Sequence, residues 1–268
     1  MKTVTLSVFS ALFLCVACGG SATISESWYT PSTQTTWQWQ LSGMVNTAYP
    51  VDLYDIDLFD SNTSLIDTLH TQGKKVICYF SAGSFEDWRE DSSRFPAEIL
   101  GKEMDGWAGE KWIDIRSDAL QPIILARLEL AKSKGCDGVE PDNVDGYSND
   151  TGFPLTASEQ LTYNRFLATE AHSRGLSVGL KNDLDQISTL ASDFDFAVNE
   201  QCHEYEECAA LQPFIDAGKP VFNAEYAQRY VKNNNHERES LCTEAKRAHL
   251  QTLILPLNLD DHFRFTCD

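Results

Sequence analysis

The chain has 268 residues, of which 42% are hydrophobic and 11% aromatic. This ordinary globular composition excludes collagen, a coiled coil and general disorder as the main architecture. The 40 Asp and Glu against 21 Lys and Arg give a net charge of −19. Nucleic acid and anionic membrane surfaces are disfavoured as partners because this charge would repel them, so we expect a neutral or cationic partner.

Residues 1–20 differ in composition from everything that follows. Lys2 is their only charged residue, residues 4–17 are almost entirely apolar, and small residues come next, which predicts an export signal. The apolar run is shorter than the ~20 residues of a membrane span. Residues 15–20 also resemble a bacterial lipoprotein processing site with Cys18 as the lipidated residue, although the Leu three residues before it is missing. Plain secretion and lipid anchoring at the outer surface both stay open.

After a Ser- and Thr-rich tether at residues 21–36, a single domain is predicted over residues 37–268. Short apolar or β-branched runs, expected to be strands, occupy residues 37–41, 51–58, 75–80, 112–115, 137–140, 176–180, 194–198, 220–223 and 252–257. Helical patterns cover residues 119–134, 157–174, 204–217 and 237–249. Helices that end in Gly before the next strand are expected at Gly73, Gly135, Gly175 and Gly218.

Repeated strand–helix units predict an α/β fold, because parallel strands are joined by crossover helices. The number of runs matches a single (β/α)8 TIM-type barrel, with residues 112–115 as a short extra strand. A doubly wound open sheet is the alternative. It is disfavoured because neither a G-x-G-x-x-G motif nor a P-loop follows an early strand.

Six of the eight cysteines lie outside the export signal. An even number of cysteines in an exported chain favours disulfides, and short separations favour the pairs Cys202–Cys208 and Cys242–Cys267. Cys78 and Cys136 are left unassigned, since Cys78 lies in an apolar run where a buried thiol fits as well as a bridge. A zinc site is disfavoured because no C-x2-C pair follows the export signal.

Catalytic side chains of a barrel lie at the carboxyl ends of its strands and in the loops that follow. Most predicted strands end in charged, amide or aromatic residues, and the candidates for the site are Asp57, Tyr79, Glu140, Asp142, Asp145, Lys181, Asn182, Glu200, Glu225 and Tyr226. Any one of them alone is better explained as a structural loop residue. Their convergence on one face predicts an acidic cleft with aromatic platforms, which suits sugars.

Glycosidic cleavage uses two carboxyl groups, one that protonates the leaving oxygen and one that attacks or activates water. The leading candidates are Glu140, Asp142, Glu200 and Glu225, and composition and spacing do not choose between them. Alternation along the strand allows Glu140 and Asp142 to share one face. Neither a metal nor a cofactor is expected, because H-E-x-x-H, EF-hand and nucleotide-binding patterns are missing from the sequence, as is a G-x-S-x-G elbow.

Six short blocks of sequence stand out, in a fixed order along the chain. They are residues 76–84 (VICYFSAGS, with Trp88 and Arg89 after it), 112–116, 137–145 (DGVEPDNVD), 179–182, 196–202 (FAVNEQC) and 221–226. Together they resemble the endo-α-1,4-polygalactosaminidase family of glycoside hydrolases. The resemblance extends from about residue 37 to the C-terminus. The polar loop at residues 232–238 is its least familiar part.

The resemblance implies a TIM-barrel enzyme that cleaves galactosamine-containing polymers of microbial biofilms and walls. It places the catalytic pair on Asp142 and Glu200, which we assign as nucleophile and acid/base of a retaining mechanism. It also implies a partly deacetylated, cationic substrate, in agreement with the negative charge of the chain. We expect Glu140, Asp145 and Glu225 to line the cleft and bind amino groups, the alternative for each being a hydrogen bond to Lys181 or to backbone.

The predicted function is therefore that of a secreted, monomeric, endo-acting glycoside hydrolase. One alternative is a non-catalytic binder of cationic polysaccharide at the barrel mouth. A binder would not need Asp142 and Glu200 at fixed positions, so their presence favours catalysis. The other alternative is a different barrel enzyme, such as an esterase or a deacetylase.

Overall fold

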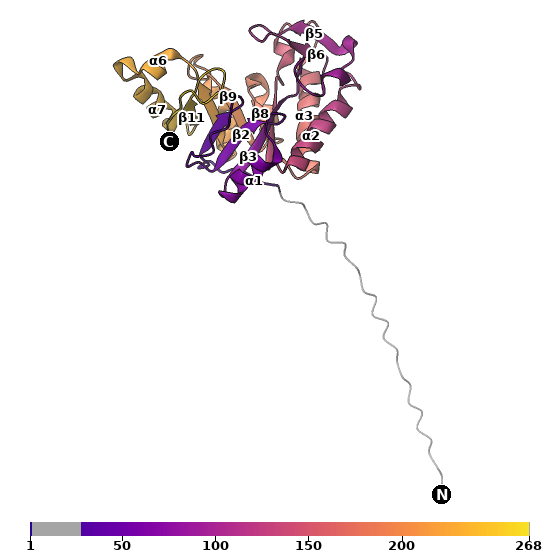
Figure 1. Ribbon diagram of the computed structural model, residues 1–268, viewed down its shortest axis with the longest axis horizontal. Helices are drawn as coiled ribbons and strands as arrows, with labels where there is room; N and C mark the ends of the chain where they lie inside the picture. The colour runs from indigo at the N-terminus through magenta and orange to yellow at the C-terminus, as the bar shows by residue number, and fades with distance from the viewer. Residues whose placement is uncertain (2–27, 268) are drawn as a thin grey trace.

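A computed structural model describes Met1 and residues 28–267 of the chain (Figure 1). The predicted export signal, with Cys18, lies outside the described residues. The predicted tether is described only from residue 28 onward, and this part packs on the domain. Trp28 stacks on His172 and donates a 3.0 Å hydrogen bond from Nε1 to Asp195 Oδ1. The packed part of the chain thus begins by Trp28, earlier than the expected residue 37.

The main element is a nine-stranded sheet in which the first eight strands are parallel. In spatial order these are β1 (Trp37–Gln40), β2 (Leu53–Asp57), β3 (Lys75–Ser81), β7 (Gly138–Asp142), β8 (Ser177–Lys181), β9 (Phe196–Glu200), β10 (Val221–Glu225) and β11 (Gln251–Ile254). The ninth, β12 (Phe265–Thr266), is antiparallel to β11. Each of the eight parallel strands overlaps one of the predicted runs.

The sheet is curled, so that its first and last parallel strands approach one another (Figure 1). Trp37 on β1 donates a 2.9 Å hydrogen bond from Nε1 to the carbonyl oxygen of Gln251 on β11. The concave face buries large side chains from strands around the curl, among them Trp37, Trp39, Phe196 and Phe222. A larger apolar cluster packs between the outer face and the helices. The predicted α/β class is confirmed.

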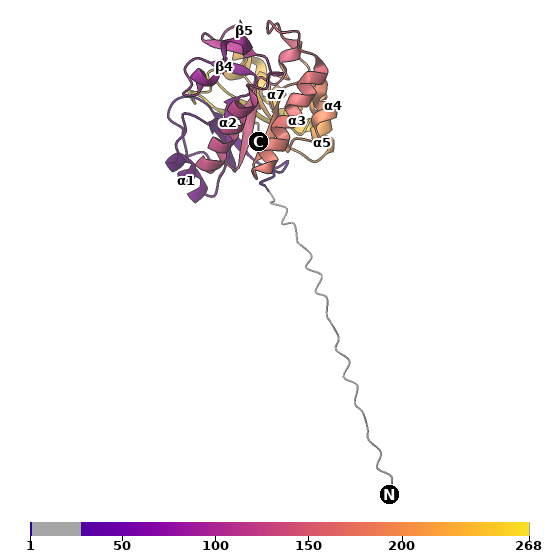
Figure 2. The same ribbon diagram turned by 90° about the vertical axis from the view of Figure 1, so that its right-hand side faces the viewer.

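Seven α-helices are found among the described residues. They are α1 (Thr63–Thr71), α2 (Gln121–Lys134), α3 (Ala157–Ser173), α4 (Ile187–Leu190), α5 (Gln212–Asp216), α6 (Gln228–Lys232) and α7 (Glu237–Arg247). Figure 2 shows α2 and α3 side by side over the sheet. A capping box between Thr156 and Glu159 begins α3, and Gly135, at φ 90°, ends α2.

Three of the four predicted helices match α2, α3 and α7 within a few residues. The prediction over residues 204–217 is wrong for its first half, and regular α-helix starts only at Gln212. The Cys202–Cys208 disulfide closes a tight loop in this segment, in which Glu206 has a φ of 60°. The apolar spacing of the segment therefore reflects loop packing rather than a helix face.

The predicted extra strand at residues 112–115 is part of a second sheet. This sheet contains β4 (Ser84–Glu86), β6 (Glu110–Ile113) and β5 (Leu100–Glu103), all antiparallel. It forms the connection from β3 to α2 and stands above the carboxyl end of the main sheet (Figure 1). The expectation of one isolated strand is thus corrected to a three-stranded sheet, two strands of which carry too few apolar residues to be recognised.

Three disulfides link the described cysteines. Cys202–Cys208 and Cys242–Cys267 confirm the two predicted pairs. The third joins Cys78 on β3 to Cys136, just before β7, and settles the pair that the sequence left open. Within residues 28–267 there is no helix with the length and apolar character needed to cross a membrane.

Candidate active site

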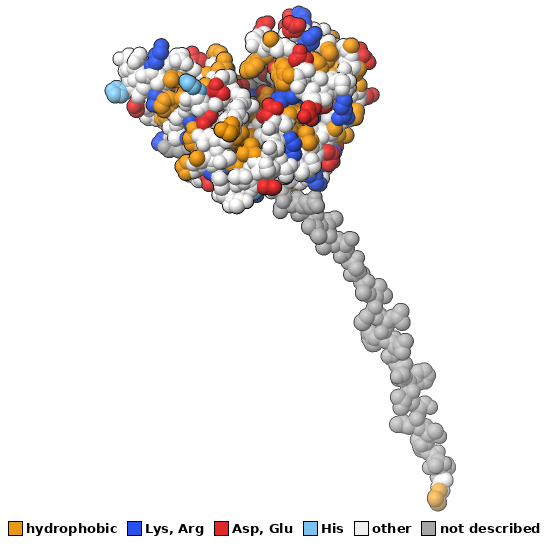
Figure 3. Space-filling view, in the orientation of Figure 1, with side chains coloured by type: hydrophobic (Ala, Val, Ile, Leu, Met, Phe, Trp, Pro, Cys, Tyr) orange, Lys and Arg blue, Asp and Glu red, His pale blue; other side chains and the backbone are white. Residues whose placement is uncertain are grey.

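A cleft of about 480 Å³ opens at the carboxyl ends of the parallel strands. Its walls include the second sheet on one side and the loop after β11, with Leu257 and Asn258, on the other. Figure 3 shows the molecule hollowed between the lobe that carries β5 and β6 and the lobe that carries α6 and α7. Of the predicted site residues, Asp57, Tyr79, Asp142, Asp145, Lys181, Asn182 and Glu200 line this cleft.

The ammonium group of Lys181, at the end of β8, lies at the centre of the cleft floor. Its Nζ is 3.0 Å from Asp142 Oδ1, 3.2 Å from Glu200 Oε2 and 3.6 Å from Glu140 Oε1. It also lies 5.0 Å from the ring centroid of Trp39. The Lys181 side chain is only 3% exposed, and the surrounding carboxylates raise its pKa well above the ordinary value despite burial. Lys181 therefore carries a permanent positive charge that lies between Asp142, Glu200 and the buried Glu140.

Asp142, the last residue of β7, is fixed through both carboxylate oxygens. Tyr79 donates a 3.0 Å hydrogen bond to Oδ2, and the backbone N–H of Asn143 donates to Oδ1 at 2.6 Å. Asn143 has a φ of 61°, which turns the chain sharply after the strand. The Asn143 side chain then donates a 2.8 Å hydrogen bond to Ser81 Oγ on β3. Asp142 thus faces the cleft in one orientation.

Glu200, the last residue of β9, is held in a similar way. The phenol of Tyr226 donates a hydrogen bond to Oε1, while Oε2 contacts Lys181. The backbone N–H of Glu200 donates to Asn182 Oδ1 at 3.1 Å. Burial, followed by the Glu200 charge, raises the pKa of Tyr226 well above its ordinary value, so this phenol remains a hydrogen-bond donor.

A pair of buried carboxyl groups, Asp55 and Glu140, lies below Lys181. Asp55 is 1% exposed and Glu140 is fully buried. Burial raises the pKa of Asp55 to about 7, while burial and then the Asp55 charge raise the pKa of Glu140 well above its ordinary value. The interaction between the two lowers the pKa of Asp55 and raises that of Glu140, so Glu140 is the member of the pair that keeps its proton. Asp55 was not among the predicted site residues, although its spacing from Asp57 places both on one strand face.

Two predicted lining residues lie elsewhere. Glu140 lies beneath the cleft floor and contacts Lys181, which corresponds to the structural alternative. Glu225 is fully buried and accepts hydrogen bonds from His203 N at 2.9 Å and Asn223 Nδ2 at 3.1 Å. Its neighbours on β10, Phe222 and Ala224, face the enclosed core, so strand alternation turns Glu225 outward. The structure does not bring Glu225 into the cleft.

The remaining predicted residues are at the cleft wall. Asp57 accepts two hydrogen bonds from Arg89, at 2.9 and 2.7 Å, so its charge is already paired. Asp145 lines the cleft after β7, and burial raises its pKa to about 6. Tyr226 is not itself a lining residue and contacts the cleft through Glu200.

Three aromatic side chains of the cleft were not predicted from the sequence. Trp88 and Trp107 line it from the second sheet, each 52% exposed, and Trp39 lies on the floor beside Lys181. Trp88 belongs to one of the blocks that resemble the hydrolase family, but no strand-end rule selects it. The three-stranded sheet that carries Trp107 was not predicted, so its place in the cleft was not predicted either.

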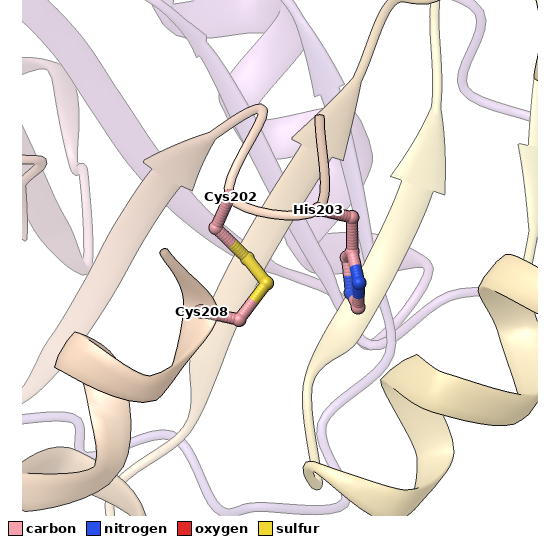
Figure 4. Close-up of side chains that lie close together, drawn as sticks. All are labelled: Cys202, His203 and Cys208. Atoms are coloured by element: carbon pink, nitrogen blue, oxygen red, sulfur yellow. A yellow bond between two sulfur atoms is a disulfide. The ribbon is translucent and has the colours of Figure 1, made fainter. Parts of the chain in front are cut away.

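Cys202, His203 and Cys208 form the one group of metal-ligand type among the described residues (Figure 4). Both sulfur atoms are bonded to each other in the disulfide and are not available as thiolates. Burial lowers the pKa of His203, which keeps this imidazole neutral. The group is therefore a structural element of the loop after Glu200.

The family model of glycoside-hydrolase family GH114 matches residues 20–268. The chain belongs to this family. The solved structure of Aspergillus fumigatus Ega3 in complex with galactosamine is 42% identical to this GH114 chain, with a TM-score of 0.85 over 90% of this chain and 98% of that one. The resemblance drawn from the sequence blocks is confirmed, and the chain is a glycoside hydrolase.

Two more distant similarities agree with the GH114 fold. The glycoside hydrolase domain of PelA from Pseudomonas aeruginosa has a TM-score of 0.66 at 13% identity, over 85% of this chain and 96% of that domain, and shares the fold. A protein of Deinococcus radiodurans, whose name assigns no activity, is 26% identical over 224 residues, which are 72% of each chain.

Proposed function

We propose that this GH114 protein is an endo-acting hydrolase of α-1,4-linked, partly deacetylated galactosamine polysaccharide. Asp142 is the nucleophile and Glu200 the acid/base of a retaining reaction. The parallel sheet closes into a (β/α)8 barrel whose mouth is the cleft. The protein acts as a monomer outside the cell, secreted or anchored through Cys18, and three disulfides in the described part support an oxidising compartment.

One observation carries the proposal: Asp142 and Glu200 contact the same buried ammonium from two different strands. The two oxygens that touch Lys181 are at most about 6 Å apart, which is near the ~5.5 Å of retaining pairs and below the ~6.5–9.5 Å of inverting ones. This closeness supports the retaining assignment.

The hydrogen bonds support the roles. Asp142 has both oxygens occupied by donors and lies beside a cation, so its carboxyl group is oriented for attack on the anomeric carbon. Glu200 donates a proton to the leaving oxygen as the glycosyl–Asp142 bond forms. It then removes a proton from the water that breaks this bond, which restores both carboxyl groups.

The substrate assignment is supported by charge and by similarity. The chain carries an excess of carboxylates, and Asp145 lines the cleft near the catalytic pair. Ammonium groups of deacetylated galactosamine would form charge-assisted hydrogen bonds there. The similarity to Ega3, solved with galactosamine, supports the same sugar. Added salt should weaken binding, because exposed charges are screened over ~8 Å at physiological ionic strength.

The test is digestion of purified, partly deacetylated α-1,4-polygalactosamine, with the release of shorter oligosaccharides as the readout. The unsubstituted protein should release a ladder of products, and Asp142→Asn or Glu200→Gln should abolish it while the fold remains intact. Asp67→Asn, an exposed carboxyl on α1, is the matched control and should keep full activity. Absence of products from the unsubstituted chain would overturn the substrate. Full activity in either cleft variant would remove that residue from the mechanism.

A further inference from the structure

The cleft does not end at Glu200. A second groove of about 410 Å³ begins on the other side of this residue, and Asp145, Asn182 and Glu200 line both. A chain molecule that crosses the catalytic pair therefore occupies two regions, one toward the second sheet and one toward the loops after β8 and β9. The chemical character of these two regions is different.

The region toward the second sheet is aromatic. Trp88 follows β4 and Trp107 lies between β5 and β6, and both expose half of their surface in the cleft. A galactose ring has an apolar face that stacks on such indole planes. Of the carboxyl groups there, Asp57 and Glu86 contact Arg89 at 2.7 and 2.8 Å. Asp60 lies 3.9 Å from Arg89, and Glu110 accepts a hydrogen bond from Ser84. The Arg89 guanidinium and its carboxylate partners therefore neutralise one another and offer little to an ammonium.

The region beyond Glu200 is acidic. Among the described residues that line this groove there is no Lys, Arg or His, and five are carboxylic acids. The acids are Asp145, Asp183, Asp185, Glu200 and Glu207. Burial raises the pKa of Asp183 to about 8. A bound cation would therefore favour ionisation of this carboxyl group.

A second feature of the same groove points to a ligand. Asn199 lines it and is 1% exposed, yet its Oδ1 accepts no hydrogen bond in the described structure. A buried amide oxygen without a donor is costly and is satisfied by an incoming N–H group. Tyr205, which is 63% exposed, adds an aromatic surface at the groove.

We propose that the two regions select different sugars: the Trp88–Trp107 region takes N-acetylated, neutral residues, and the groove beyond Glu200 takes residues with a free ammonium. The enzyme then cleaves preferentially at junctions between acetylated and deacetylated residues. This specificity rests on the proposed function. On one side a neutral sugar stacks on the indole rings without placing an unpaired ammonium there, while on the other side an ammonium gains charge-assisted hydrogen bonds that an acetamide cannot form.

The experiment uses the full chain and an α-1,4-polygalactosamine that has been N-acetylated at random. Products are sequenced by tandem mass spectrometry after isotopic labelling of the new reducing ends, so both ends created by each cut are identified. We expect acetylated residues to be enriched at one new end and deacetylated residues at the other. At each end the ratio of the two kinds of residue should differ from the bulk ratio by about three- to tenfold. Both ends at the bulk composition would overturn the proposal while leaving the hydrolase function intact. Absence of products would instead overturn the function itself.

Variants separate the two regions. The Trp88→Ala, Trp107→Ala double variant should lose the acetylated preference at one end only, and Trp88→Phe, Trp107→Phe should restore it. Asp185→Asn with Glu207→Gln should lose the free-amine preference at the other end only. If either double variant loses the preference at both ends, the division into two regions is contradicted. It is also contradicted if the Trp→Ala and the acid-to-amide double variants both leave the end compositions unchanged.

Discussion

Tyr79 donates a 3.0 Å hydrogen bond from its phenol oxygen to Oδ2 of Asp142, across the neighbouring strands β3 and β7. Burial, followed by the Asp142 charge, raises the pKa of Tyr79 well above its ordinary value. The phenol therefore remains a donor throughout the physiological pH range. With Lys181 and the backbone of Asn143 on the other oxygen, this contact fixes the rotation of the carboxylate.

Tyr79→Phe should lower kcat about 10- to 100-fold and change KM little, because a hydrogen bond to a charged group contributes ~1.5–3 kcal/mol. Steady-state kinetics on galactosamine oligomers checks this. Tyr54→Phe is the matched control, since its buried hydroxyl donates at 2.9 Å to the backbone of Asn46 outside the cleft. The control should lose stability without losing kcat. Equal loss of kcat in both variants would contradict the orienting role of Tyr79.

The strand alternation and the strand ends of this chain were readable from sequence. Each parallel strand was located because apolar runs of four to eight residues between Gly-terminated helices have few alternative explanations. The ends of β7, β8 and β9 then placed Asp142, Lys181 and Glu200 on one edge, and the structure brings these three together.

The residues that were missed depend on contacts between distant segments. Asp55 is buried in mid-strand, and only the packing of β2 beside β3 and β7 shows that it meets Glu140. The prediction for Glu225 assumed that the last residue of a strand faces inward. Side chains alternate between the two faces of a strand, and at the end of β10 it is Ala224 and Tyr226, not Glu225, that face inward. Glu225 therefore points outward, and Tyr226 lies next to Glu200.

Lys181→Met should destabilise the protein by about 3–5 kcal/mol and remove most activity, because it leaves the partly buried carboxylates of Asp142 and Glu200 without their cation. Chemical denaturation and product release measure the two effects. Lys134→Met is the control, since that ammonium donates to backbone carbonyls of Leu58 and Ser61, both at 2.7 Å, away from the cleft. The control should lose stability but keep its rate per folded molecule. A fully active Lys181→Met would show that the ammonium is only structural.

Asp55→Asn tests the buried carboxyl pair through pH. The pKa of Asp55 is raised to about 7 by burial, so the folded state binds this proton more tightly than the unfolded state does. The unsubstituted protein should therefore lose stability relative to the variant as pH rises from ~4 to ~7, with a slope of at most ~1.4 kcal/mol per pH unit. Outside this window the difference should be constant. Denaturant melts of both proteins across the range give the difference directly, and a rise in relative stability with pH would have the wrong sign for this pair.

The Cys202–Cys208 disulfide closes the loop that begins two residues after Glu200 (Figure 4). His203, which follows Cys202, donates a hydrogen bond from its backbone N–H to Glu225. The bridge spans only six residues, so its chain-entropy contribution is about 2 kcal/mol. We expect the double variant Cys202→Ser, Cys208→Ser to lower turnover more than Tm, because the loop positions the carboxylate of Glu200.

The Cys78–Cys136 disulfide supplies the matched comparison, because it spans 58 residues and joins β3 to the start of β7 beneath the helices. Its chain-entropy contribution is about 4 kcal/mol, and Cys136 precedes β7, at the opposite end of that strand from Asp142. Cys78→Ser, Cys136→Ser should therefore lower Tm more than the loop variant does and keep more of the rate per folded molecule. Calorimetry together with active-site titration separates the two quantities. If the loop variant instead loses more Tm than the core variant while its folded molecules turn over at the normal rate, the short bridge stabilises the fold and does not position Glu200.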